Sequence, residues 1–297
     1  MQWSEKTKHV CSEVIKKKNL PADFISTIED IYLPLANGIV NKKQHSPLLV
    51  SINGAQGTGK STLTSFLQYI IESEFSLRVA DLSIDDFYYT RKDREVLSKK
   101  VHPLLMTRGV PGTHDIELLE NSLGSLINQE DCRIPRFDKA RDDRVADSNW
   151  CQYRQGIDII LFEGWCNHSP FQDDASLIKP VNELEQYEDQ HGVWRHYVND
   201  QLKLYHQRIF NQADMVIMLK AESFEKVYEW RKLQEDKLRK NTTSDKNFIM
   251  NDDELKRFIQ HYERITRHTL LNLPDIADVT IPVAGDHKFK GGLLHDL

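Results

Sequence analysis

A glycine-rich turn between an apolar run and a helical pattern constrains this chain more than any other feature. Residues 48–71 read LLVSINGAQGTGKSTLTSFLQYII: a run typical of a buried strand, a turn, and then apolar residues at helical spacing. The turn fits the pattern G-x-x-x-x-G-K-[ST] from Gly54 to Ser61. Glycines let backbone N–H groups point inward around an anion, and the following helix directs its positive dipole end to the same place. The segment therefore predicts a cradle for the phosphates of a nucleoside triphosphate.

Two side chains in this turn have defined chemical tasks. Lys60 can reach the outer phosphates, and the Ser61 hydroxyl can ligate Mg²⁺. The residues predicted to bind the nucleotide are Gly54, Ala55, Gln56, Gly57, Thr58, Gly59, Lys60, Ser61 and Thr62. Because the match follows a strand pattern and opens a helix pattern, we interpret it as a functional site and not as a chance glycine-rich turn.

Strand patterns alternate with helix patterns along the rest of the chain. Short apolar runs predict strands at 48–52, 78–84, 157–162, 215–219 and 279–283. Apolar spacing predicts helices at 62–71, 115–127, 181–211, 223–240 and 252–271, with Thr113 as the N-cap of the second. This alternation predicts an α/β fold, a three-layer sandwich of the P-loop NTPase type with a mainly parallel central sheet. Residues 1–46 are predicted as a helical N-terminal extension and residues 47–297 as the main domain.

Composition narrows the possible classes of protein. A chain of 297 residues with 39% hydrophobic residues suits one α/β domain with extensions. A net charge of −6 argues against a general nucleic-acid binder. No apolar run approaches the ~20 residues of a membrane span, and the first residues contain no apolar secretory core. The four cysteines form no C-x-x-C pair, so we expect reduced thiols in a cytoplasmic protein. From the charge and the apolar runs we expect neither membrane nor nucleic-acid partners.

Carboxylates follow two of the predicted strands. Glu163 ends the strand pattern DIILF, and ligands of open α/β sheets bind beyond the carboxyl ends of the strands, so Glu163 is a candidate partner for Mg²⁺. Asp85 and Asp86 follow the strand at 78–84. One of them is a candidate base that orients an acceptor hydroxyl, and the other can bind Mg²⁺ or a helix N-terminus.

Six motifs carry a resemblance to a known family. They are SIDDFYYT (83–90), HPLLMTRGVPGTHD (102–115), IPRFDKARDDR (134–144), IILFEGWC (159–166), VYEWRKLQEDKLR (227–239) and MNDDELKRFIQHYERITRH (250–268). Together they resemble plant-type D-glycerate 3-kinase and its bacterial and fungal relatives. That group belongs with phosphoribulokinase, uridine kinase and pantothenate kinase among the P-loop kinases. The resemblance covers roughly residues 47–290.

The resemblance implies that MgATP phosphorylates a hydroxyl of a small molecule, most simply D-glycerate. It implies Asp85 as the base, with Asp86 left as a possible Mg²⁺ ligand, Glu163 near the metal, and the loop from Arg108 to Asp115 near the acceptor. The residues support an anionic acceptor, because a small carboxylate with hydroxyls needs cationic and hydrogen-bonding groups. The candidate acceptor residues are Arg108, Thr113, His114, Asp115, Arg136, Asp138 and Lys139.

The helix expected at 223–240 has the position of a lid. Lids bring cations to the transferred phosphoryl group and expel water, and Arg231 is the candidate catalytic arginine beside Lys60 and Asp85. A solvated helix face with internal ion pairs is the alternative for this segment. A nucleoside or pantothenate kinase, or an ATP-binding switch protein without a metabolite acceptor, are the alternatives for the whole chain. The oligomeric state stays open.

Overall fold

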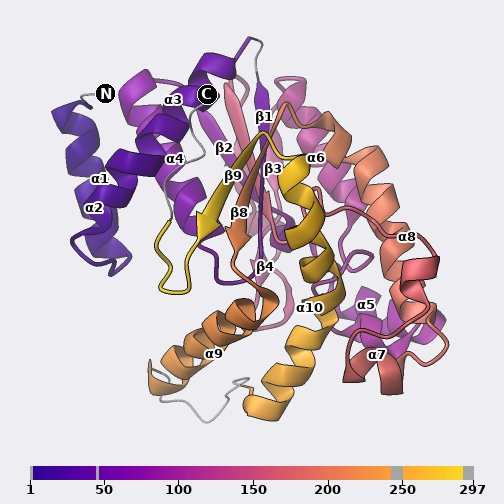
Figure 1. The fold of residues 1–297 in the computed structure, drawn as a ribbon. Helices are drawn as coiled ribbons and strands as arrows, with labels where there is room; N and C mark the ends of the chain where they lie inside the picture. Colours follow the sequence, from indigo (N-terminus) through magenta and orange to yellow (C-terminus); the bar gives the residue numbers. More distant parts are fainter. Residues whose placement is uncertain (1–2, 45–46, 242–249, 290–297) are drawn as a thin grey trace.

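Five parallel strands form the centre of the molecule, in the order β2-β7-β1-β8-β9 (Figure 1). In chain order they span Leu48–Gly54 (β1), Val79–Ser83 (β2), Ile159–Gly164 (β7), Met215–Ala221 (β8) and Val279–Val283 (β9). The computed structural model describes residues 3–44, 47–241 and 250–289. Every pairing between neighbouring strands of this sheet is parallel, which confirms the predicted sheet.

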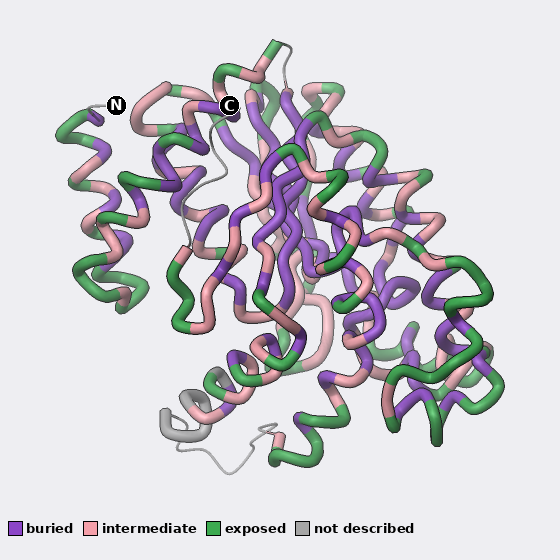
Figure 2. The backbone as a smooth tube through the Cα atoms, in the orientation of Figure 1, coloured by how far each residue is buried: buried purple, intermediate pink, exposed green. Residues whose placement is uncertain are grey.

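Strand β7 explains why the sheet is buried on both faces. Its residues Ile159 and Leu161 join one hydrophobic cluster, and Ile160 and Phe162 join another. Because successive side chains of a strand point to opposite faces, the two clusters lie on opposite sides of the sheet. Four successive apolar residues, Ile159 to Phe162, are typical of a parallel sheet covered on both sides. Buried residues follow the sheet through the middle of the molecule in Figure 2.

Helices cover both faces and complete the predicted three-layer sandwich. One cluster contains side chains from α1 (Glu5–Lys17), α3 (Leu33–Lys42) and α4 (Lys60–Phe75). The other contains side chains from α6 (Ile116–Ile127), α8 (Val193–Arg208) and α10 (Asp252–Asn272). Within the described residues, no helix combines the length and the hydropathy that a membrane crossing requires.

The N-terminal helices pack on α4. Ser4 is the N-cap of α1: its hydroxyl accepts a hydrogen bond from the N–H of Thr7 at 3.2 Å. The side-chain hydroxyls of Ser4 and Thr7 both donate to the carboxylate of Glu74 on α4, each at 2.7 Å. Cys11 of α1 and Phe66 of α4 belong to the same buried cluster. Residues 3–44 therefore share a hydrophobic core with the central sheet.

The helix predicted over 181–211 is two helices, α7 (Glu183–Glu188) and α8. Asn182 caps the start of α7 with its side chain. The chain then turns at Gly192, whose φ of +74° is a conformation that glycine adopts without strain. Apolar residues occur at helical spacing on both sides of this turn, so their periodicity alone does not reveal the break.

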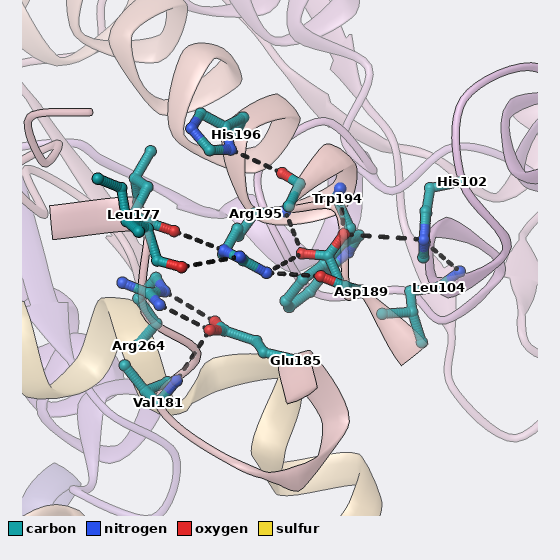
Figure 3. Close-up of polar contacts among 12 residues, drawn as sticks. His102, Leu104, Leu177, Val181, Glu185, Asp189, Trp194, Arg195, His196 and Arg264 are labelled. Atoms are coloured by element: carbon teal, nitrogen blue, oxygen red, sulfur yellow. Dashed lines mark hydrogen bonds and ion pairs between the residues drawn. The ribbon is translucent and has the colours of Figure 1, made fainter. Parts of the chain in front are cut away.

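Two buried arginines hold segment 175–189 against α8 and α10 (Figure 3). Arg195 of α8 donates to the carboxylate of Asp189 at 3.0 Å. Arg264 of α10 donates to both carboxylate oxygens of Glu185, at 2.7 and 2.6 Å. Each guanidinium also donates to main-chain carbonyls of this segment. The ion pairs therefore fix the path of the chain between the two helices.

The N-cap of α6 differs from the prediction. Asp115 holds this position, and its Oδ1 accepts from the N–H of Leu118 at 3.1 Å. Thr113 accepts from the N–H of Gly109 at 3.0 Å and donates to the carbonyl of Val110 at 2.7 Å. Both residue types cap helices well. The predicted N-cap was wrong, because the capping side chain is that of Asp115, two residues after Thr113 and directly before the first helical residue.

The remaining elements are further helices, two antiparallel strand pairs and short turns. Helix α5 (Arg91–Lys100) and two antiparallel strand pairs are not predicted by the sequence patterns. The strand pairs are β3 (Cys132–Ile134) with β6 (Cys151–Tyr153), and β4 (Phe137–Asp138) with β5 (Asp143–Arg144). Helix α9 (Phe224–Asn241) follows β8, as predicted. The short turns are α2 (Phe24–Thr27), a π-helical turn (Ile28–Tyr32) and 3₁₀ turns at Ile84–Phe87, Pro103–Met106, Asp147–Asn149, Ala175–Leu177, Phe210–Gln212 and Leu273–Asp275.

Candidate active site

The loop between β1 and α4 has the geometry of a phosphate cradle. Gly57 and Gly59 have φ of +84° and +93°, which side chains rarely adopt. The Thr58 hydroxyl donates to the carbonyl of Ala55 at 2.8 Å and closes the turn. Lys60 is the first residue of α4, a helix of 16 residues. The positive end of this helix therefore faces the loop, as anion binding requires.

Strand register brings Glu163 beside the cradle. Strand β7 lies between β1 and β2, and Glu163 is level with Ile52 on one side and Ser83 on the other. The Ser61 hydroxyl donates to its Oε1 at 3.0 Å. Burial raises the pKa of Glu163, and the ammonium of Lys60 partly offsets this effect. A buried carboxylate that retains some cost of ionisation is well suited to a bound cation.

Asp85 follows β2 and lies near two cations, Lys139 and Lys60. Its Oδ2 accepts from the ammonium of Lys139 at 2.6 Å, and its Oδ1 accepts from the hydroxyl of Tyr88 at 2.7 Å. Burial alone would raise the pKa of Asp85, but Lys139, Tyr88 and Lys60 hold it below its ordinary value. Burial lowers the pKa of Lys60, while Glu163 and Asp85 act to raise it. Asp85 therefore stays ionised beside the cradle lysine.

Asp86 points to the hairpin formed by β4 and β5. Its carboxylate accepts from Arg136 at 2.6 Å and from the N–H of Phe137 at 3.0 Å. Burial raises the pKa of Asp86 against the opposite effect of Arg136. Asp138 accepts from two N–H groups of the hairpin turn, at 2.9 and 3.2 Å. Arg136, Asp86 and Asp138 thus hold the hairpin in place, while Lys139 extends from it to Asp85.

Asp142 joins the hairpin to two other segments. It has a φ of +55°, uncommon for a residue with a side chain. Its carboxylate pairs with Arg94 of α5 at 2.9 Å and also with Arg108. Arg94 is 1% exposed, and the guanidinium carbon of Arg108 lies 5.5 Å from the ring centroid of Phe137. The shared carboxylate therefore sets where Arg108 lies.

Side chains from outside the loop fix the backbone of residues Arg108 to Asp115. The Trp165 indole donates to the carbonyl of Gly109 at 2.8 Å, and the Tyr262 hydroxyl donates to the carbonyl of Arg108 at 3.1 Å. Gly109 has a φ of +136°, and a Cβ there would overlap the Tyr262 hydroxyl. The loop is thus held by Trp165, directly after β7, and by Tyr262 of α10.

Arg231 lies on α9, the predicted lid. It forms an ion pair with Glu235 one turn further along the helix. Its guanidinium carbon lies 6.0 Å from the ring centroid of Phe258 on α10. These contacts orient Arg231 toward the side of α9 that faces α10. A second cation of α9, Lys232, pairs with Asp252 at 2.5 Å.

Comparisons with known proteins agree with this geometry. No family model matches the chain. The kinase mug58 of Schizosaccharomyces pombe is 31% identical over 233 residues, which cover 74% of this chain and 80% of that protein. The chain belongs to the glycerate 3-kinase-related family of P-loop kinases. A relative from Saccharomyces cerevisiae, 28% identical over 271 residues, is named a probable ATP-dependent kinase, and this protein is a small-molecule kinase that uses ATP.

Two further members of this P-loop kinase family support the assignment. The chloroplastic D-glycerate 3-kinase of Arabidopsis thaliana is 30% identical over 228 residues, 73% of this chain but only 46% of that protein. The D-glycerate 3-kinase structure from Cryptococcus neoformans has a TM-score of 0.71 at 25% identity, covering 91% of this chain and 98% of that one.

This P-loop kinase also has residues at the cradle that the sequence analysis missed. Trp230 of α9 packs on Gly57, where a Cβ would lie 2.7 Å from the Trp230 Cβ. The Trp230 indole donates to the carbonyl of Gly285 at 3.0 Å, and its ring centroid lies 4.7 Å from that of His287. The lid helix and the chain after β9 therefore meet at the P-loop. The only sequence signal for this contact is the place of Trp230 beside the candidate Arg231.

Proposed function

We propose that this kinase transfers the γ-phosphate of ATP to a hydroxyl of a small anionic hydroxy acid, with D-glycerate as the first candidate. One observation carries the proposal: the Asp85 carboxylate lies beside the P-loop lysine and is paired at 2.6 Å with Lys139 from a separate hairpin. A protein that only binds and hydrolyses ATP has no need of an acceptor base with its own cation. The names of the Arabidopsis and Cryptococcus relatives support D-glycerate as the acceptor.

Cations around Asp85 support an acceptor with a negative charge. Lys139 comes from the hairpin, Arg108 from the loop over Phe137, and Lys60 from the cradle. The Arg108 guanidinium has a planar fork of donors that matches a carboxylate, and Lys139 is a point charge that reorients easily. We expect the acceptor carboxylate to lie between Arg108 and Lys139, with a hydroxyl directed to Asp85.

The residues at the end of the cradle fit Mg²⁺. The Ser61 hydroxyl and the Glu163 carboxylate are hard oxygen donors 3.0 Å apart. Within the described part of the chain, no group of three or more His, Cys, Asp or Glu residues can hold a metal alone. This suits Mg²⁺, which takes most of its ligands from phosphates and water. When bound, Mg²⁺ would neutralise charge on the outer phosphates.

The protein groups then have separate tasks in the transfer. Asp85 orients the acceptor hydroxyl and takes its proton as the new O–P bond forms and the bond from the γ-phosphorus to the bridging oxygen breaks, which releases ADP. Its low pKa suits a late proton transfer in a loose transition state. Lys60 offsets charge on the outer phosphates, and Arg231 does so when the lid closes. Asp86 keeps the hairpin, and so Lys139, in position through Arg136.

The test is ADP release from MgATP by the purified protein with D-glycerate, L-glycerate, uridine, pantothenate or no acceptor. We expect stimulation by D-glycerate alone, and ³¹P NMR of the product identifies the phosphorylated hydroxyl. Stimulation by another compound replaces the acceptor and keeps the kinase chemistry. A slow rate that is the same with every addition would contradict the proposal and favour the switch protein. Lys60→Ala, which removes the cradle ammonium, controls for a contaminating kinase.

A further inference from the structure

Tyr205 of α8 contacts the loop from Arg108 to Asp115, the acceptor loop, at two points. It is fully buried, and its oxygen accepts from the N–H of Gly112 at 2.7 Å. The same oxygen lies 3.0 Å from Nδ1 of His114, which is 1% exposed. Gly112 and His114 lie in this loop, whose Arg108 the proposed function places beside the acceptor carboxylate. No sequence pattern connects Tyr205 with them, because they are about 90 residues apart.

Counting protons assigns the tautomer of His114. A phenol has one proton to donate, and the Gly112 N–H already uses one lone pair of the Tyr205 oxygen. If Tyr205 donates to Nδ1, then both groups of this contact are satisfied and the neutral imidazole carries its proton on Nε2. The reverse direction would leave the Tyr205 proton without an acceptor among the described residues. It would also leave the Nε2 lone pair unpaired. The first arrangement is therefore the favourable one.

Nε2 of His114 is buried and has no hydrogen-bond partner among the residues that the structure describes. The ring stacks on Tyr88, with centroids 4.6 Å apart, and the Tyr88 hydroxyl donates to Asp85. Burial lowers the pKa of His114 to about 4, and the charge of Asp85 acts in the opposite direction. A neutral imidazole with an unpaired N–H thus lies next to the proposed base.

We propose that Tyr205 is a positioning residue that holds His114 in its Nε2–H tautomer, so that His114 donates a hydrogen bond to a hydroxyl or carboxylate oxygen of the acceptor. This inference rests on the proposed function, because the oxygen belongs to the acceptor of the transfer. It adds a neutral donor to the cations at the site. A neutral donor discriminates by the position of an oxygen atom and adds no further charge.

The tautomer is tested first, in the ligand-free full-length protein. Long-range ¹H–¹⁵N NMR distinguishes protonation at Nδ1 from protonation at Nε2, and His114→Asn identifies the resonances. We expect the Nε2–H pattern in the wild type and a mixture of tautomers in Tyr205→Phe. A pure Nδ1–H pattern in the wild type would overturn the proposal. This measurement uses no acceptor, so its outcome does not depend on whether D-glycerate is the substrate.

Kinetics then test the donor. Tyr205→Phe is expected to raise KM for the acceptor about tenfold, the loss of one well-placed hydrogen bond, with KM for ATP unchanged. His114→Gln, whose amide N–H₂ lies near the place of Nε2, should retain most acceptor affinity. His114→Asn, whose amide lies near Nδ1, should not. If D-glycerate proves inactive, the acceptor that does release ADP is used instead.

Tyr197→Phe is the matched control, because its ring on the same helix also packs against Gly112. We expect its KM for the acceptor to match that of the wild type. If Tyr205→Phe lowers the midpoint of thermal unfolding but leaves KM for the acceptor unchanged, Tyr205 is a structural residue only and the proposal is wrong. Equal KM increases in Tyr197→Phe and Tyr205→Phe would also contradict it, because packing would then explain both.

Discussion

The pair of Asp85 and Lys139 combines two opposing effects on one carboxylate. Burial makes ionisation costly, whereas an ammonium 2.6 Å away makes it favourable, and the second effect prevails together with Tyr88 and Lys60. Lys139 itself is largely exposed on a hairpin turn. The cation can therefore move to an acceptor carboxylate without unfolding anything, and Asp85 remains ionised because Lys60 stays nearby.

Asp85→Asn tests the base directly. The amide keeps the size of the side chain and can still accept from Tyr88, but it cannot take a proton. We expect kcat to fall by about 10² to 10⁴, the usual contribution of a general base, while the Kd for ATP changes little. The measurement is steady-state kinetics with nucleotide binding by calorimetry. Asp131→Asn, an exposed aspartate away from the site, is the control; near-normal turnover in Asp85→Asn would pass the role to Asp86.

Lys139→Met tests the electrostatic coupling through pH. In the wild type the folded pKa of Asp85 lies below its ordinary value, so the active carboxylate persists as the pH falls through the mildly acidic range. Removing Lys139 leaves burial as the main effect, which raises this pKa. We therefore expect the acid limb of the kcat profile to move to higher pH. Lys99→Met, at an exposed lysine of α5, should leave the profile unchanged; an unshifted limb in Lys139→Met would refute the coupling.

At the scale of elements, the acceptor loop depends on a conformation that only glycine tolerates. Gly109→Ala would place a methyl group against the Tyr262 hydroxyl at a φ of +136°. We expect KM for the acceptor to rise at least tenfold and the thermal midpoint to fall. Gly124→Ala is the matched control: it lies inside α6 with open space around a Cβ, and should stabilise the protein by about 0.5–1 kcal/mol. Kinetics and thermal unfolding of both variants distinguish the loop from a general effect of alanine.

Helix α10 offers a second matched pair, because its Arg264 is buried and its Arg257 is exposed. Arg264→Met leaves the carboxylate of Glu185, 0% exposed, without its partner. We expect the free energy of unfolding to fall by about 3–5 kcal/mol, the usual cost of an uncompensated buried charge. Arg257→Met removes an exposed pair with Glu188 and should cost less than about 1 kcal/mol. Urea unfolding measures both, and similar losses would show that burial of the pair does not matter.

Local signals explain what could be predicted from the sequence. The strands follow from short apolar runs, and the cradle follows from one contiguous motif. Glu163 and Asp85 follow from their places after strands. The structure indeed brings both carboxylates within electrostatic reach of Lys60. These inferences need only the rule that parallel strands end at one edge of a sheet.

Contacts between distant segments explain what could not be predicted. Arg94 and Asp142 are 48 residues apart, and nothing in their neighbours' pattern marks them as a pair. The hairpin of β4 and β5 is too short to show a strand period, with two residues in each strand. The sequence did indicate Arg136, Asp138 and Lys139 as a cluster, but only the fold shows that each has a different partner.

At the scale of the whole molecule, the N-terminal helices help to bury one face of the sheet, the face that α4 also covers. The ring centroids of Tyr32 and of Phe66 on α4 lie 5.7 Å apart. Leu35 and Ile39 of α3 are fully buried in the same cluster. The sequence divides the chain into an extension of residues 1–46 and a domain of residues 47–297. The shared core leads us to propose that the two parts fold as one unit.

Deleting residues 1–46 tests this proposal. Each large apolar side chain that loses its burial costs about 1.5–3 kcal/mol. The described part of the extension buries Trp3, Cys11, Val14, Ile15, Ile28, Ile31, Tyr32, Leu33, Leu35, Ala36 and Ile39 in the common cluster. Deletion would leave their partners in residues 47–297, among them Phe66 and Leu67 of α4, exposed to water, and a typical domain has only roughly 5–15 kcal/mol of net stability to offset this. We therefore expect residues 47–297 alone to be insoluble or to lack a cooperative thermal transition, as circular dichroism would show. Co-expression of residues 1–46 as a separate chain should restore part of the soluble protein. A soluble truncated protein with wild-type ATP turnover would instead establish residues 1–46 as an independent extension.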